Sequence, residues 1–128
     1  MVSCSYGAFR TPAVRSAQML PAGGGTLDVP GRPQVVATPG HTPGSVAFHL
    51  PAQGVLFTGD ALVTQEGIVG RTGPTIVSAA FTHSTEQALA SLSALAPLDA
   101  GLLLPAPGEP FTGAPDDAVR VARLAGTC

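Results

Sequence analysis

Lysine and tryptophan are missing from this sequence, and its charged and aromatic residues are few. The 128 residues contain 6 basic residues, all arginine, and 8 acidic ones, which gives a net charge of -2. The arginines are scattered along the chain, so no basic cluster is present that would bind nucleic acid or an acidic membrane surface. We therefore expect neither kind of partner.

Long apolar runs are also missing. No stretch of about 18 apolar residues exists, which excludes a membrane-spanning helix, and the N-terminus lacks the apolar core of a secretory signal. The two cysteines, Cys4 and Cys128, show no CxxC spacing and are too few for a disulfide framework. We therefore predict a cytoplasmic protein whose thiols are unpaired, with a disulfide or a metal pair as the alternatives.

The hydrophobic content of 45% is enough to bury a core of ordinary size within one domain. Residues 1–25 show no clear periodicity and contain Pro12, Pro21 and the glycines 23–25, so they are predicted to form a loose N-terminal arm. Residues 26–128 are predicted to form the folded domain.

Four short stretches near the start of that domain have the composition of strands and are separated by turn residues. The third alternates, with Phe48 on one face and His49 on the other, and the fourth is a continuous apolar run typical of a strand buried on both faces. An antiparallel meander is predicted over 26–29, 34–38, 45–50 and 55–57.

The second half of the domain alternates between helical and extended patterns. Residues 61–83 are rich in glycine and are predicted to form a long connection. The capping box Ser84 to Gln87 begins a helix over 85–96, a buried strand follows at 101–104, and Pro115 begins a second helix that ends before Gly126. The order predicts an α/β or α+β fold, a mostly antiparallel sheet with two helices on one face.

The stretch 38–60, with the sequence TPGHTPGSVAFHLPAQGVLFTGD, contains the strongest functional signal. His41 lies between two Pro-Gly corners, and Asp60 follows the end of a buried strand. Because strand ends and the loops after them collect polar groups in one crevice, these two side chains are expected to lie together. Neutral imidazole and carboxylate are ligands that suit zinc.

The motifs TPGHTPGS, LFTGD, RTGP and LLLPAPGEPFTG, in this order, resemble the C-terminal half of a metallo-β-lactamase-fold hydrolase. This superfamily includes glyoxalase II, lactonases and thioesterases, and the resemblance covers about residues 26–126. It implies half of an αββα sandwich, and a metal-dependent hydrolase of esters, thioesters, lactones or lactams. It also assigns His41 to the first zinc ion and makes Asp60 the catalytic carboxylate that bridges two, with Thr42, Ser45 and Arg71 as loop contacts.

Several ligands that the resemblance implies are missing. The HxHxDH motif of the family has no counterpart here, and Pro107 stands where the family has its last histidine. Because catalytic zinc needs about three protein ligands, we expect zinc to bind weakly or not at all to this chain. The chain is then the second half of a longer or two-chain enzyme or, as we favour, a degenerate member that is weak or inactive alone.

Other roles for the candidate residues stay open. His41 could instead hydrogen-bond Asp60 or a backbone carbonyl and thereby fix its loop. His49 is predicted to lie on the outer face or at an interface, and His83 to begin the helix and reach a metal only if the long loop folds back. Glu66 and Glu109, both in loops, are expected to be solvated.

Half of a sandwich would leave an apolar sheet face open, and such faces mark interfaces. We therefore predict a homodimer or a partner chain on the face opposite the helices, unless residues 1–25 fold back over it. A non-catalytic binding or assembly module is the alternative function, and a truncated product without a role is a third. The bias to alanine, glycine, proline and arginine indicates a GC-rich bacterial coding sequence, in which a misplaced start is plausible.

Overall fold

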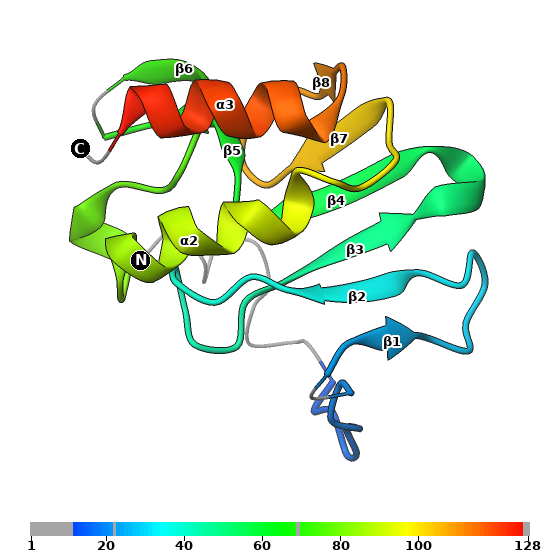
Figure 1. The fold of residues 1–128 in the computed structure, drawn as a ribbon. Coiled ribbons are helices and arrows are strands. Elements are labelled where there is room, and N and C mark those ends of the chain that lie inside the picture. Colours follow the sequence, from blue (N-terminus) through cyan, green and yellow to red (C-terminus); the bar gives the residue numbers. More distant parts are fainter. Residues whose placement is uncertain (1–11, 22, 69, 127–128) are drawn as a thin grey trace.

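The computed structural model describes residues 12–21, 23–68 and 70–126. Two helices lie side by side on one face of a mixed sheet, and a small two-stranded sheet flanks them (Figure 1). The elements are β1 (Gly25–Thr26), β2 (Gln34–Ala37), β3 (Val46–Leu50), η2 (Pro51–Gln53), β4 (Val55–Gly59), β5 (Val63–Glu66), β6 (Arg71–Thr75), η3 (Ala79–Phe81), α2 (Thr85–Leu95), β7 (Leu102–Pro105), β8 (Phe111–Thr112) and α3 (Pro115–Ala125).

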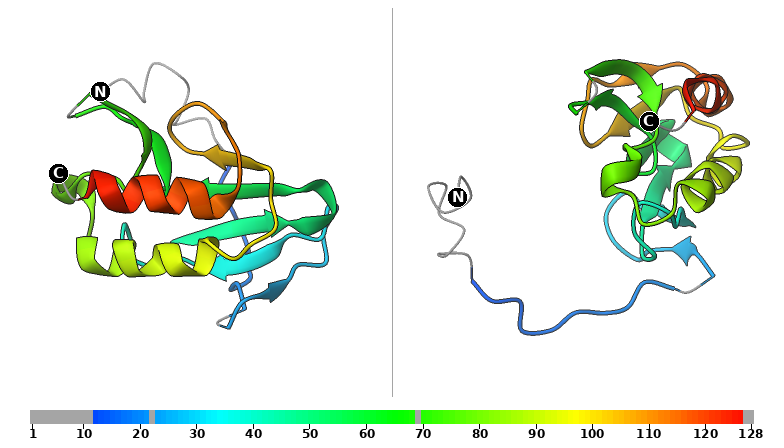
Figure 2. Two further views of the ribbon diagram at one scale, coloured as in Figure 1. Left: turned by 45° about the horizontal axis from the view of Figure 1, so that its top comes forward. Right: turned by 90° about the vertical axis from the view of Figure 1, so that its left-hand side faces the viewer.

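The main sheet has the strand order β1-β2-β3-β4-β7-β8, and only the β4–β7 pair is parallel. Parallel neighbours need a crossover connection, which here is made by β5, β6 and α2. Both helices cover the same face of the sheet (Figure 2). The predicted fold class is therefore confirmed: an α+β domain with a mostly antiparallel sheet and two helices on one face.

The helices begin and end where the sequence predicted. The Ser84 side chain accepts a hydrogen bond from the backbone N–H of Gln87, so it caps α2, whose apolar side chains Ala88, Leu92 and Leu95 are buried. Pro115 lies in the first turn of α3, and Gly126 follows its last residue with φ 68°. Buried side chains of both helices pack against the sheet residues Ala47, Leu56 and Leu103.

The expectation of an unstructured connection over 61–83 was wrong. Its first part forms the β5–β6 hairpin, in which Val63 pairs with Thr75 and Glu66 with Arg71. The hairpin is stabilised because Val63 and Thr75 are fully buried and β6 packs against α3. The predicted loop after β7 also contains a strand, since β8 pairs with β7 through Leu102 and Thr112.

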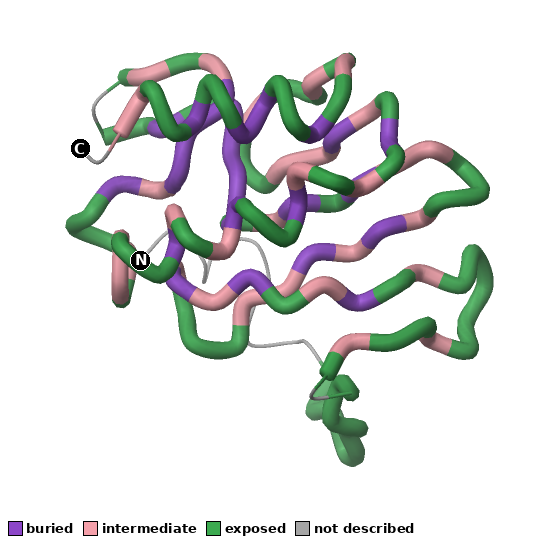
Figure 3. The backbone as a smooth tube through the Cα atoms, viewed as in Figure 1, coloured by how far each residue is buried: buried purple, intermediate pink, exposed green. Residues whose placement is uncertain are grey.

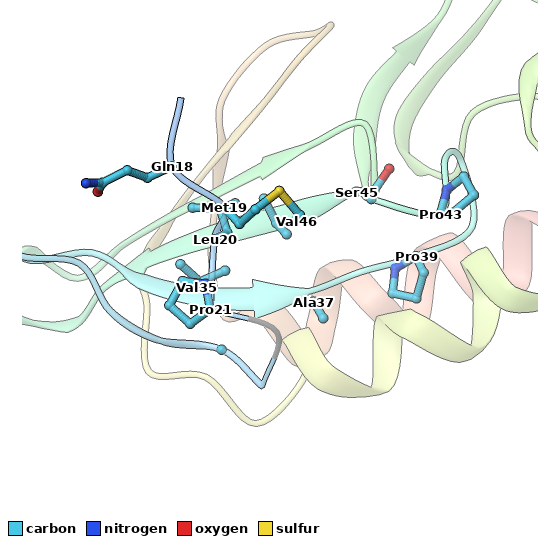
Figure 4. Close-up of a pocket in the computed structure, with 12 residues that line it drawn as sticks. Gln18, Met19, Leu20, Pro21, Val35, Ala37, Pro39, Pro43, Ser45 and Val46 are labelled. Atoms are coloured by element: carbon cyan, nitrogen blue, oxygen red, sulfur yellow. The ribbon is translucent and has the colours of Figure 1, made fainter. Parts of the chain in front are cut away.

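The first strand is shorter than predicted. Only Gly25 and Thr26 pair with β2, because the chain turns immediately afterwards: the N–H of Leu27 bonds to the carbonyl of Pro33, and Arg32 N–H bonds to the Val29 carbonyl. Of the predicted N-terminal arm, residues 12–21 contain no helix or strand. Residues 18–21 line an apolar groove with β2 and β3 (Figure 4), and the chain before them runs away from the domain on the side opposite the helices (Figure 2, right). Cys4 and Cys128 lie outside the described residues.

The two faces of the main sheet are not equally covered. Leu56 of β4 is fully buried beneath the helices, but its neighbour Phe57 points to the other face and is 43% exposed. Buried and partly exposed residues alternate along β3 and β4 (Figure 3). The prediction that β4 is buried on both faces was therefore wrong: nothing in the described structure covers its second face over Phe57.

His49 lies on the buried face of the sheet and not on the outer face that was predicted. It is 4% exposed. Its Nε2 donates to the carbonyl oxygen of Asp99 at 2.8 Å, and its Nδ1 lies 3.4 Å from Oε1 of Gln34. The alternation along β3 was assigned correctly, but the helices pack on the face with the smaller Ala47.

Among the described residues, no helix is long and apolar enough to cross a membrane.

Candidate metal centre

His41 lies in a tight loop between β2 and β3 that is held by its own hydrogen bonds. The Ser45 hydroxyl accepts from the backbone N–H of Thr42 at 3.1 Å and lies 2.8 Å from the Thr42 hydroxyl. Gly40 is buried with φ 147°, and a Cβ at this position would overlap the backbone of Ala88 in α2. The loop is therefore pressed against the first turns of α2, and Thr42 and Ser45 shape it.

A second segment packs on the loop from the side of α2. The backbone N–H groups of His83 and Ser84 donate to the carbonyls of His41 and Gly40, at 3.1 and 2.9 Å. The Ser91 hydroxyl donates to the Pro39 carbonyl at 2.6 Å. The connection before α2 thus folds back onto the His41 loop. The sequence contains no pattern that would have indicated these contacts, because they join groups that are far apart along the chain and include a backbone carbonyl in every case.

Asp60 follows β4, and the structure brings it to the His41 loop. The Nε2 atom of His41 lies 3.9 Å from Oδ2 of Asp60, with the side chains 23% and 48% exposed. That separation is too long for a hydrogen bond. Nδ1 of His41 is buried and has no hydrogen-bond partner among the described residues. Within the described part of the chain, the ring nitrogens of His41 therefore make none of the structural hydrogen bonds that were considered as the alternative role.

The other candidate side chains lie elsewhere. Nη1 of Arg71 donates to the Ala125 carbonyl at 2.8 Å, so this side chain joins β6 to the C-terminal end of α3, where a cation is favourable. The His83 side chain is exposed. Glu66 was expected to be solvated but is 6% exposed, and its Oε2 accepts from the N–H of Ile68, which closes the β5–β6 turn. Glu109 is exposed, as expected.

The loop after β7 lies next to the same end of β4. The N–H of Ala106 donates to the Gly59 carbonyl at 3.2 Å, and Thr64 N–H bonds to the carbonyl of Pro107 at 3.4 Å. Pro107 is thus fixed by two neighbouring bonds close to the residue before Asp60. Its ring has no donor atom for a metal, so this loop adds no ligand through Pro107.

The described residues do not complete a zinc site by themselves. No group of three or more His, Cys, Asp or Glu side chains within them is arranged to hold a metal ion. Catalytic zinc takes about three protein ligands, and His41 and Asp60 are two. The unpartnered, buried Nδ1 of His41 and the half-exposed carboxylate of Asp60 fit part of such a site and leave the remainder to groups beyond this set.

A mixed sheet with helices on one face places the His41 loop beside Asp60 at a strand end. The sequence profile described as "Metallo-beta-lactamase superfamily" matches residues 11–106. The chain belongs to the metallo-β-lactamase superfamily.

Individual relatives agree with this assignment but are longer. The chain is 37% identical over 84 residues to the probable metallo-hydrolase YflN of Bacillus subtilis, a match over 61% of this chain and 32% of YflN. A 31-residue match at 61% identity, over 24% of this chain and 12% of the relative, is to a hydroxyacylglutathione hydrolase of Mesorhizobium japonicum. A metallo-β-lactamase family protein of Thermus thermophilus superposes with a TM-score of 0.55 at 31% identity, over 78% of this chain and 32% of that one. The chain thus spans about a third or less of these relatives.

Proposed function

We propose that this chain is part of a metal-dependent hydrolase and supplies His41 and Asp60 as metal donors, without the further donors that a complete site needs. The observation that supports it is the pair itself: two donor groups from separate elements, 3.9 Å apart, with one imidazole nitrogen buried and unpartnered. Because two donors fall short of the usual three, the chain binds zinc weakly by itself and has little or no activity alone. Asp60 is its proposed catalytic carboxylate.

The names of the relatives support a proposal for the substrate class. One is named a hydroxyacylglutathione hydrolase and another a metallo-hydrolase, so an ester, thioester, lactone or lactam is the bond that we propose a completed site would hydrolyse. The further ligands would come from a second segment or chain. In such a site His41 would hold the ion, and Asp60 would hold it from the end of β4.

Zinc titration by calorimetry tests this proposal, with the wild-type chain beside His41→Ala and Asp60→Ala. We expect weak binding in the wild type that is lost in both variants, because each removes one of two donors. His83→Ala is the matched control, since it removes an exposed histidine from the neighbouring segment. Zinc binding that is equal in all four proteins would refute the site.

The same titration can test position 107, where proline stands in place of the histidine that the family resemblance implies. Pro107→His places an imidazole on the loop beside Gly59, so we expect zinc affinity to rise by about tenfold or more and to depend on His41. Pro110→His, on the same loop, is the control. Ester and lactone hydrolysis by the unmodified chain, far above the His41→Ala background, would contradict the proposal that its metal site is incomplete.

A second candidate function is a non-catalytic assembly module. The observation that favours it is the sheet face without helices, where Phe57 on the interior strand β4 is 43% exposed. Exposed apolar surfaces of this kind are typical of protein interfaces. In this proposal the scaffold forms a homodimer, and the zinc titration shows no binding above the variant background.

A further inference from the structure

Ser91 stands in the middle of α2 and makes a hydrogen bond that leaves the helix. Its hydroxyl donates to the carbonyl oxygen of Pro39 at 2.6 Å, across 52 positions of sequence, and Pro39 lies beside α2 (Figure 4). A serine inside a helix is a poorer helix former than alanine, and its hydroxyl commonly points to solvent or bonds to the carbonyl four residues before it. The bond from Ser91 to a loop therefore indicates a role outside the helix itself.

Three consecutive carbonyl groups of the His41 loop accept hydrogen bonds from α2 and the residues just before it. The Ser91 hydroxyl donates to the first of them, on Pro39. Backbone N–H groups of residues 83–84 donate to the next two, on Gly40 and His41. The two peptide planes that adjoin the Cα atom of His41, and the plane before them, are thus each held by one hydrogen bond. Of these three bonds, the one from Ser91 is made by a side chain, so a substitution can remove it.

The bond to Pro39 fixes the backbone at the most constrained part of the loop. Gly40 has φ 147°, which side chains rarely permit, and it lies against the backbone of Ala88. Ala88 and Ser91 are three positions apart, so they share one face of α2. This face contacts the loop twice, through the close approach of Gly40 and through the Pro39 carbonyl. Because His41 follows Gly40 directly, these contacts determine the direction of its side chain.

We propose that Ser91 is a positioning residue of the candidate metal centre, which holds the loop so that Nε2 of His41 faces Oδ2 of Asp60 at 3.9 Å. As far as zinc is concerned, this inference rests on the proposed function. Ser91 acts through the Pro39 carbonyl and is not itself a ligand. Groups that hold metal ligands in place typically contribute about 10- to 100-fold to metal affinity. Because Ser91 acts through the backbone, we expect an effect at the lower end of this range.

The matched control lies two positions further along the same helix. Nη2 of Arg123 donates to the Ser93 hydroxyl at 2.7 Å, and this bond joins α3 to α2. Ser91→Ala and Ser93→Ala therefore make the same change in one helix, and each removes one hydrogen bond. Of the two variants, only Ser91→Ala leaves the Pro39 carbonyl without its donor. Ser91→Thr keeps the hydroxyl and serves as the conservative variant that should restore the wild-type behaviour.

NMR of the isotope-labelled full chain without metal is the first measurement. In the wild type we expect one χ1 rotamer for His41 and amide order parameters of about 0.85 at residues 40–41. In Ser91→Ala we expect the order parameters to fall towards about 0.6 and the three-bond couplings of His41 to show averaging over rotamers. Ser93→Ala and Ser91→Thr should resemble the wild type. If His41 is equally ordered in both alanine variants, Ser91 only stabilises the fold and the proposal is overturned.

Zinc titration of the same four proteins is the second measurement and separates this inference from the proposed function. We expect the affinity to fall by about tenfold in Ser91→Ala and to be unchanged in Ser93→Ala and Ser91→Thr. Equal zinc affinity in the wild type and Ser91→Ala would refute the positioning role and leave the metal site intact. If none of the proteins binds zinc, the proposed function fails, and the order of the His41 side chain still decides what Ser91 does.

Discussion

Both faces of the main sheet contain large apolar side chains, but the surroundings of the two faces differ. Leu56 and Leu103 pack beneath the helices and are fully buried, while their chain neighbours Phe57 and Leu104 face a side without helices. A strand that is apolar on both faces is typical of a sheet with layers on both sides. The comparison teaches that the sequence is that of a central sheet, whereas the described residues supply a covering layer for one face only.

Leu56→Ala tests the face of the main sheet that the helices cover, and it has the largest expected effect on stability. Removing a fully buried leucine from the cluster beneath the helices should lower the free energy of unfolding by about 2 to 5 kcal/mol. Urea denaturation followed by circular dichroism measures this. Phe57→Ala, at the next position, is the control and should cost much less when measured at concentrations where the chain is monomeric, because its side chain is 43% exposed. Equal costs would mean that both faces are covered.

Gly40→Ala tests the packing of the His41 loop on α2 at the candidate site. The added Cβ overlaps the backbone of Ala88, and φ 147° is unfavourable for alanine, so we expect a loss of about 2 to 3 kcal/mol. Gly44, in the same loop, has open space where a Cβ would lie, with no neighbouring atom within 4 Å, and its φ is not positive. Gly44→Ala should therefore be nearly neutral in the same thermal or urea melts. A neutral Gly40→Ala would show that the loop does not pack tightly on α2.

Much of the fold could be predicted because it depends on local chemistry. The Ser84 cap and Pro115 at the start of α3 fix both helices through short-range hydrogen bonds and backbone geometry. The β5–β6 hairpin was missed because its strands are short, and glycine and proline within β6 weaken the pattern. Its stability comes from packing against α3, which no local signal contains.

The candidate site was predictable in part for a related reason. His41 and Asp60 stand in motifs whose spacing is specific, and the structure brings them together at 3.9 Å. The support around them was not predictable, because His83 and Ser84 contribute backbone N–H groups, which every residue except proline has. Which side of β3 is buried could not be predicted either, because complementary packing, and not polarity alone, determines which face the helices cover. His49 therefore lies in the interior despite its polar ring.

His49→Leu tests how much the polar ring of His49 contributes to stability on the covered face. The Nε2–H of His49 donates to the Asp99 carbonyl at 2.8 Å, which ties β3 to the turn before β7. Leucine keeps the volume but leaves this carbonyl without its partner, so we expect a loss of about 1 to 2 kcal/mol in urea denaturation. Gln34→Ala is the control, because its contact with Nδ1 is long, at 3.4 Å, and should contribute little. Amide exchange of residues 99 to 101 should rise in His49→Leu alone. If stability is instead unchanged or increased, burial of the ring is only tolerated, and apolar packing determines which face of β3 the helices cover.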